Sequence, residues 1–269
     1  MTQAFLLPAA AAIFGFGGAA LRAWELATAF EPNTGLPIPG APASLVLTLL
    51  SLLFALVSAA ILWRICRKAP ARNFNTAFVC ESTGYVTAVV SAAALPLCAA
   101  GLIVLDCLKG ARGMAHFLPA ALFLFSAGSI VSVGRNNYRN LEQGQFTLSL
   151  LLAPFAFCAH LMLTYQIHAG NPVLQDYAYL LLALICTVLG LYFMASFSFE
   201  KGRPFLFLWT AGLAVYFSCI TAVNSLLLAL KGQFDWPNLA LCLFSIVYFT
   251  VHGGVLLRNL TDKEETPHE

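Results

Sequence analysis

The chain has 269 residues, of which 60% are hydrophobic and 10% are charged, and its mean hydropathy is +0.82. A soluble domain holds about 45–50% apolar and about 25% charged residues, and a globule has too little polar surface to cover so many apolar side chains. This composition excludes a soluble domain, a disordered chain and a nucleic-acid-binding protein, and the formal net charge of +2 indicates no particular partner. The sequence therefore predicts an integral membrane protein that is surrounded by the lipid bilayer.

Eight segments are long and apolar enough to cross a bilayer, which takes about 20 predominantly apolar residues per helix. These segments cover residues 4–22, 44–65, 84–107, 115–134, 146–167, 177–198, 205–230 and 238–257. Turn residues separate them, as in Pro37–Gly40 and Lys201–Pro204. We therefore predict an all-α fold, a polytopic transmembrane helix bundle in which residues 1–258 form one domain and residues 259–269 form a short acidic cytoplasmic tail.

The Lys and Arg residues predict that both chain ends lie in the cytoplasm, because short cytoplasmic connections are enriched in basic residues. With the N-terminus inside, ten basic residues fall on the cytoplasmic side and four fall on the outer side. The cytoplasmic group is Arg64, Arg67, Lys68, Arg72, Arg135, Arg139, Lys201, Arg203, Arg258 and Lys263, and the outer group is Arg22, Lys109, Arg112 and Lys231. The compact chain favours the plasma membrane of a bacterium as its location.

Residues 1–22 leave a second topology open. The small residues Gly18–Ala20 are typical of a signal-peptide cleavage site, but Met1–Gln3 lack the basic residues that begin a signal peptide. We expect the segment to be retained as the first span. Its cleavage would leave seven spans with the N-terminus outside.

Small and large apolar residues predict how some spans are placed. Gly15 and Ala19 form a small-xxx-small pair in the first span, which lets two helix backbones approach closely. The second and sixth spans are rich in leucine and are expected to face lipid on most sides.

The eight cysteines follow no metal-binding or disulfide pattern. None of them belongs to a Cys-x-x-Cys pair, and most lie inside apolar segments, where cysteine behaves as a small apolar residue. Neither a disulfide framework nor a metal site is predicted, and the sequence indicates no cofactor.

Polar residues within the spans are the candidate functional residues, because polar groups are expensive in the bilayer interior. Those that recur at three- or four-residue steps share one helix face. The predicted ligand-binding residues are His160 and Thr164 in the fifth span, Ser218, Thr221 and Asn224 in the seventh, and His252 in the eighth. If these faces converge, they enclose a polar cavity. The alternative is that they only form hydrogen bonds between helices, each worth about 0.6 kcal/mol.

The depths of His160 and His252 argue against a shared metal or haem. At a rise of about 1.5 Å per residue, His160 lies about 5 Å outside the membrane midplane and His252 about 6 Å inside it. Each is expected to be a structural histidine with satisfied hydrogen bonds or, alternatively, a proton relay or a ligand contact.

Four further polar residues lie toward the predicted outer face, namely Arg22, Glu25, Asp106 and His168. Arg22 and Glu25 are three residues apart and can pair along a helix, which is worth about 0.2–0.5 kcal/mol at an exposed position. The group is expected to consist of ordinary polar residues at the level of the lipid headgroups. The alternative is an outer vestibule for a cation or a polar ligand.

Three functions are consistent with the sequence. The polar faces favour a carrier that binds or transports a small solute through a polar cavity in the bundle. The alternatives are a non-enzymatic membrane subunit or sensor that acts through a partner membrane protein, and a membrane-embedded enzyme that uses a buried histidine on a lipid or hydrophobic substrate. The chain contains no HExxH, GxSxG or GxxxxGK[ST] motif, so an enzyme is the least favoured of the three.

Overall fold

The computed structural model describes residues 2–31, 36–67, 73–110, 112–139, 147–170, 173–230, 232 and 235–261. Within these residues the chain forms nine α-helices and two short 3-10 helices, and no strand. The helices are α1 (Thr2–Thr28), α2 (Pro42–Cys66), α3 (Phe74–Ala77), α4 (Thr83–Leu108), η1 (Met114–His116), α5 (Phe117–Tyr138), α6 (Thr147–His168), α7 (Leu174–Ser196), η2 (Phe197–Phe199), α8 (Pro204–Leu230) and α9 (Trp236–Thr261).

Each predicted span corresponds to one long helix, which confirms the all-α transmembrane bundle. Seven helices, α2 and α4 to α9, are long and apolar enough to cross a membrane. The eighth long helix, α1, has 27 residues and continues six residues beyond the predicted end of the first span. Helix α9 runs to Thr261, three residues into the predicted tail, and residues 262–269 lie outside the described part of the chain.

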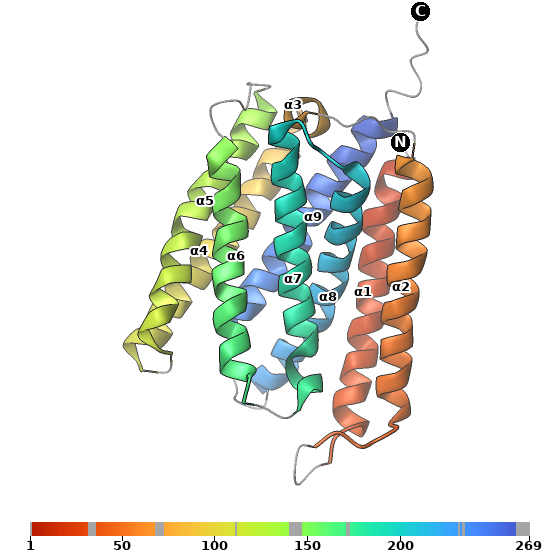
Figure 1. The fold of residues 1–269 in the computed structure, drawn as a ribbon, viewed down its shortest axis with the longest axis vertical. Coiled ribbons are helices and arrows are strands. Elements are labelled where there is room, and N and C mark those ends of the chain that lie inside the picture. Colours follow the sequence, from red (N-terminus) through yellow and green to blue (C-terminus); the bar gives the residue numbers. More distant parts are fainter. Residues whose placement is uncertain are drawn as a thin grey trace, which may run out of the picture.

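The long helices run side by side along the long axis of the molecule (Figure 1). Helices α4, α5, α6, α7, α8 and α9 each contact the next, and α9 returns to contact α4, so that these six close into a ring. Helix α1 packs on α8 and α9, and α2 packs on the outer side of α1 and α8. The α1–α2 pair therefore flanks a six-helix core.

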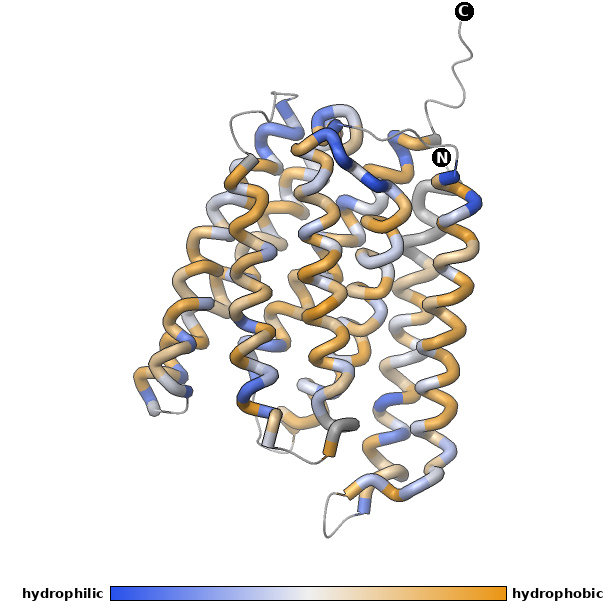
Figure 2. Tube along the Cα trace, viewed as in Figure 1, coloured by the Kyte–Doolittle hydropathy of each residue, from blue (hydrophilic) through white to orange (hydrophobic). Residues whose placement is uncertain are grey.

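The start of α1 and the end of α9 lie at the same end of the bundle, which we call the terminal end (Figure 1). The opposite end, the distal end, holds the last residues of α1, α4, α6 and α8 and the first residues of α2, α5, α7 and α9. Hydrophobic residues dominate the length of the helices, and hydrophilic residues gather at both ends and in the connections (Figure 2). This distribution is the one expected of an integral membrane protein. Which end faces the cytoplasm stays a prediction from the basic residues.

The two leucine-rich spans differ in their surroundings. Only 22% of the central part of α2 is buried inside the protein, so the prediction of a lipid-facing second span is confirmed. In α7, the sixth span, the buried share is 56%, so the same prediction is wrong there. The reason is that α7 lies in the ring between α6 and α8, where Leu180, Leu184 and Leu191 are buried against protein and only Leu182 and Leu189 are exposed among its described leucines that are not half-buried.

Helix α1 contacts α8 closely through its glycines. A Cβ atom built on Gly15 would lie 2.9 Å from Sγ of Cys219, and one built on Gly18 would lie 2.9 Å from Cδ1 of Ile220. Ala19 is buried at 4% exposure. The close approach predicted from the Gly15–Ala19 pair is therefore present, because these positions carry too little side chain to hold the helices apart.

Replacing Gly15 with leucine is expected to lower the free energy of unfolding by about 1–3 kcal/mol, because the added atoms force α1 away from α8. Gly17 has no atom within 4 Å of the position of its Cβ, so Gly17→Leu in the same helix is the matched control. Thermal unfolding of both variants in one detergent measures the difference. Equal melting temperatures would contradict the close packing of α1 on α8.

Candidate functional site

One face of α9 carries polar side chains through the whole length of the bundle. Asn238, Ser245, His252 and Asn259 follow one another at seven-residue intervals, which places them on one face of the helix. Each bonds to a different neighbour: Asn238 to α6, Ser245 to α7, His252 to α4, and Asn259 to the backbone at and after α3. Helix α9 therefore makes polar contacts with α6, α7 and α4 of the core and with the segment around α3.

The first of these contacts leads to a fully buried histidine. Nε2 of His160 lies 2.8 Å from Oδ1 of Asn238, and Nδ2 of Asn238 donates to Oδ2 of Asp235 at 2.7 Å. Arg112 continues the chain, because its Nη2 donates to Oδ1 of Asp235 and its Nε donates to Oδ2 of Asp106, both at 3.2 Å. We call these five residues the His160 network.

The His160 network runs from the protein interior to the surface of the distal end. His160 has no exposed surface and Asn238 is 3% exposed. The side chains of Asp106 and Asp235 are 34% and 36% exposed, and that of Arg112 is 14% exposed. The network therefore connects a histidine in the bundle interior with carboxylates that water reaches.

Hydrogen-bonding rules fix the tautomer of His160. A carboxylate only accepts hydrogen bonds, so the amide nitrogen of Asn238 must face Asp235 and its oxygen must face His160. That oxygen also only accepts, so Nε2 of His160 carries the proton and donates it. In the neutral imidazole, Nδ1 is then a bare acceptor, and it has no hydrogen-bond partner among the described residues.

His252 is satisfied at both ring nitrogens. Nδ1 lies 2.9 Å from the carbonyl oxygen of Tyr248, to which it donates, and Nε2 lies 3.2 Å from the hydroxyl of Tyr85. That hydroxyl accepts from Nδ2 of Asn137 at 2.9 Å, which leaves its own proton free to bond to His252. His252 therefore fits the prediction of a structural histidine, whereas His160 has an unsatisfied nitrogen.

The structure keeps the two histidines in separate polar networks. A column of four buried rings, contributed by Phe123, Phe157, Phe244 and Tyr248, lies between them. The ring centroids along the path from His160 to His252 are 5.7, 5.1, 5.3, 4.9 and 4.1 Å apart. We call this set the aromatic column.

The other predicted ligand-binding residues lie outside these networks. Thr164 is buried one turn after His160 on α6. On α8, Ser218 and Thr221 are buried and Asn224 is half-buried, and the hydroxyl of Thr221 donates to the carbonyl of Phe217 in its own helix. His160 and His252 belong to different networks, and neither network includes Thr164, Ser218, Thr221 or Asn224.

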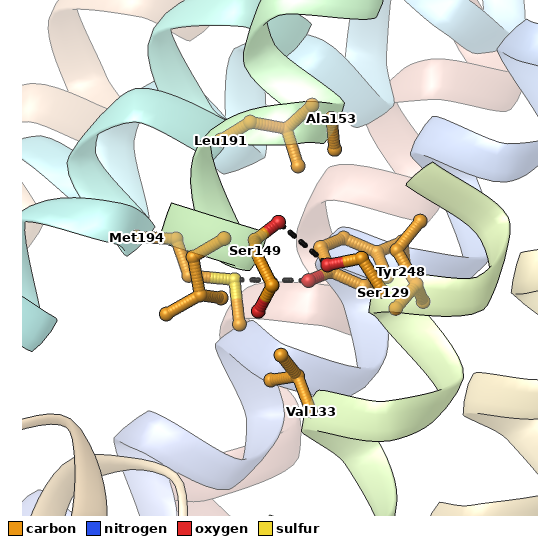
Figure 3. Close-up of a pocket in the computed structure, with 9 residues that line it drawn as sticks. Ser129, Val133, Ser149, Ala153, Leu191, Met194 and Tyr248 are labelled. Atoms are coloured by element: carbon orange, nitrogen blue, oxygen red, sulfur yellow. Dashed lines mark hydrogen bonds between the residues drawn. The ribbon is translucent and has the colours of Figure 1, made fainter. Parts of the chain in front are cut away.

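A small internal cavity lies between α5, α6, α7 and α9 (Figure 3). Two hydrogen bonds join residues that line this cavity, as Figure 3 shows. The Ser129 hydroxyl donates to the backbone carbonyl of Ser149, and the Tyr248 hydroxyl donates to Sδ of Met194. Its volume of about 10 Å³ is the least that one water molecule requires. None of the six predicted ligand-binding residues lines this cavity.

Arg22 and Glu25 form an ion pair, but at a buried position. Nη1 of Arg22 lies 2.6 Å from Oε2 of Glu25, and each side chain is only 1% exposed. The Arg22 guanidinium carbon also lies 5.2 Å from the ring centroid of Tyr179 on α7 and 5.9 Å from that of Phe30. The two residues pair along the helix as predicted, but the pair is buried and not exposed, because packing of α1 in the bundle covers both residues.

The other two residues predicted on the outer face, Asp106 and His168, lie in different surroundings. Asp106 belongs to the His160 network, and half-buried His168 stacks on Tyr177 with ring centroids 5.0 Å apart. Sequence reasoning did not single out Asn238, Asp235 or Arg112 as partners of His160. The signal that could have found the first of them is the seven-residue spacing along α9.

The fold defines the class of the protein, an integral membrane protein built as a bundle of long apolar helices. No protein-family model, no curated protein and no solved structure matches the chain. Its function is therefore inferred from the geometry of the polar networks.

Glu25→Gln is expected to lower the free energy of unfolding by about 3–5 kcal/mol, because buried Arg22 loses its carboxylate partner. Asp106→Asn is the control, because a partly exposed ion pair contributes only about 0–1 kcal/mol. Chemical unfolding in detergent, followed by tryptophan fluorescence, measures both. The double variant Arg22→Met, Glu25→Leu removes both charges and is expected to be more stable than Glu25→Gln. A less stable double variant would show that the buried charge is not the cause.

Proposed function

We propose that the protein is a proton-linked membrane transporter that moves a small solute across the bilayer, with His160 as its proton acceptor. The observation that carries this proposal is the His160 network, which connects Nε2 of a buried imidazole to carboxylates at the distal surface and leaves Nδ1 of the same ring bare. Ionisable side chains inside transmembrane bundles commonly belong to proton relays or substrate pathways.

The chemistry of the network suits reversible protonation of one imidazole. Asn238 holds Nε2 of His160 as a donor, so an incoming proton has Nδ1 as its only acceptor. Asp235, which bonds to the other end of the Asn238 amide, stabilises the positive charge that results. Histidine suits this role because either ring nitrogen of an imidazole can bind or release a proton.

His160→Ala is expected to slow the dissipation of a pH gradient across vesicles that contain the protein. The vesicles are supplied with a mixture of amino acids, sugars, nucleosides and carboxylates, and a trapped pH-sensitive dye reports the internal pH while valinomycin and potassium clamp the membrane potential. His168→Ala is the matched control, because His168 lies on the same helix outside the network. Equal rates for the wild type and His160→Ala would contradict the proposal.

A membrane subunit that acts through a partner protein is the second candidate. It is favoured by the close packing of the predicted lining residues, of which His160, Thr164, Ser218, Thr221 and His252 are at most 3% exposed. A carrier needs space for its solute, whereas a subunit that works through its outer surface does not.

Purification of the tagged chain in a mild detergent from its own host distinguishes the two candidates. The subunit function predicts one additional membrane protein in near-equal amount. Isolation of the chain alone, repeated in several detergents, would count against it and would favour the transporter.

A further inference from the structure

We infer that a zwitterionic phospholipid occupies a surface pocket at the distal end of α2, with its glycerol-ester region in the pocket and one acyl chain along the leucines of that helix. The pocket lies between the α1–α2 connection and the first two turns of α2. Such a lipid site is independent of the His160 network and of the proposed transport.

The pocket has room for part of a lipid molecule. Its volume is about 300 Å³, and small-molecule sites in proteins have volumes from about 300 Å³ upward. Pro37–Ala41 of the α1–α2 connection form one wall, and Ser44, Leu45 and Thr48 of α2 form the other. This connection lies at the distal end of the bundle (Figure 1).

Backbone hydrogen bonds hold the wall that the connection supplies. The N–H of Ile38 donates to the carbonyl oxygen of Ala29 at 2.8 Å, and the N–H of Ala41 donates to that of Ile38 at 3.2 Å. Gly40 between them has a φ of +76°, which glycine adopts without strain. The pocket is therefore formed before a ligand arrives, and binding does not require the wall to become ordered.

The lining is apolar apart from two hydroxyl groups, and it carries no charge. The hydroxyl of Thr48 donates to the carbonyl oxygen of Ser44 at 2.8 Å, and its own oxygen still accepts. The hydroxyl of Ser44 has a proton to donate. An ester group is uncharged and accepts such a hydrogen bond, so the glycerol-ester region of a lipid matches this lining.

The charge of the surroundings favours a zwitterionic headgroup over an anionic one. The described residues 29–31 and 36–48 contain a single charged side chain, that of Glu31. Phe30 and Pro37 form a β-bridge, so Glu31 lies next to the wall of the pocket. A carboxylate attracts the ammonium group of a zwitterionic headgroup and repels an anionic headgroup or a free fatty acid.

The pocket opens onto the lipid-facing stripe of α2, the helix whose central part is only 22% buried. Four leucines that are each more than half exposed begin at the pocket, namely Leu45, Leu49, Leu52 and Leu56. They recur at three- and four-residue steps and so share one helix face. At about 1.5 Å per residue the stripe is about 16 Å long, close to half of the ~30 Å hydrocarbon core of a bilayer. An acyl chain that leaves the pocket therefore fits along the stripe within one leaflet.

Exposed tryptophans place the pocket at the level of the lipid ester groups. Trp24 near the end of α1 and Trp236 at the start of α9 are both exposed at the distal end. Tryptophan collects at the boundary between the hydrocarbon core and the headgroups. Helix α2 begins at the same end, so its first two turns lie near this boundary.

Photocrosslinking of the full chain in detergent tests the lipid site. The probe is a phosphatidylethanolamine that carries a diazirine on its acyl chain next to the ester. After illumination, peptide mass spectrometry is expected to find the label concentrated in residues 37–48, and unlabelled phosphatidylethanolamine is expected to displace it. Phosphatidylglycerol with the same chains and oleic acid are expected to displace it about tenfold less well, because both are anionic.

A pair of variants in α2 tests whether the pocket itself binds the lipid. Thr48→Phe places a ring in the pocket and is expected to lower the labelling of residues 37–48 about tenfold. Thr48 is exposed, so the ring disturbs no buried contact. Val46→Phe is the matched control, because Val46 is exposed on the same helix and does not line the pocket, and its labelling is expected to equal that of the wild type.

The position of the label in the wild-type protein decides the question if Thr48→Phe does not fold. Label spread over the exposed faces of α2, α4 and α6 in proportion to their exposure would overturn the site. Unchanged labelling of a folded Thr48→Phe variant would do the same. Equal displacement by phosphatidylglycerol or by oleic acid would overturn the choice of a zwitterionic phospholipid as the occupant.

Discussion

A polar group inside a bilayer must find its partner within the protein, and this constraint organises the whole bundle. Helix α9 meets it by placing Asn238, Ser245, His252 and Asn259 on one face and bonding each to a different neighbour. Since those neighbours belong to α6, α7, α4 and the segment around α3, one helix fixes the relative positions of most of the core. Nδ1 of His160, on the neighbouring helix α6, has no partner among the described residues, whereas the four polar side chains on this face of α9 each have one.

The fold was largely predictable because a membrane-spanning helix can be recognised in the sequence by its length and its apolar composition. All eight long helices correspond to predicted segments, and the largest change is the extension of α1 from Arg22, where the predicted span ends, past Glu25 to Thr28. The predicted first span ends at Arg22 because charged residues lower the hydropathy of a segment, and a segment of low hydropathy is expected at the protein surface. The structure buries them instead, because they pair with each other and lie near the ring of Tyr179. Likewise, the leucines of α7 were expected to face lipid, and composition alone does not distinguish lipid from neighbouring protein.

The candidate site was predictable only in part. His160 was identified from the polar face of its helix, but its partner Asn238 lies 78 residues away in the chain. Periodicity within a helix predicts which residues share a face and not which face of another helix they meet. The expected convergence with Asn224 and His252 therefore had no support from spacing. The bare Nδ1 of His160 depends on the tautomer of the ring, which follows only once the partners of Asn238 are known.

The aromatic column has a consequence for how the two halves of the molecule communicate. Hydrocarbon rings neither accept nor pass on a proton, so Phe123, Phe157 and Phe244 insulate His160 from His252 chemically. The same rings are in direct contact, and a closely packed interior transmits displacement. The contacts continue from Phe123 beside His160 as far as Tyr248, whose ring is tilted by 37° against that of His252. The column therefore provides a packed contact between the distal and terminal halves of the bundle and no path for a proton.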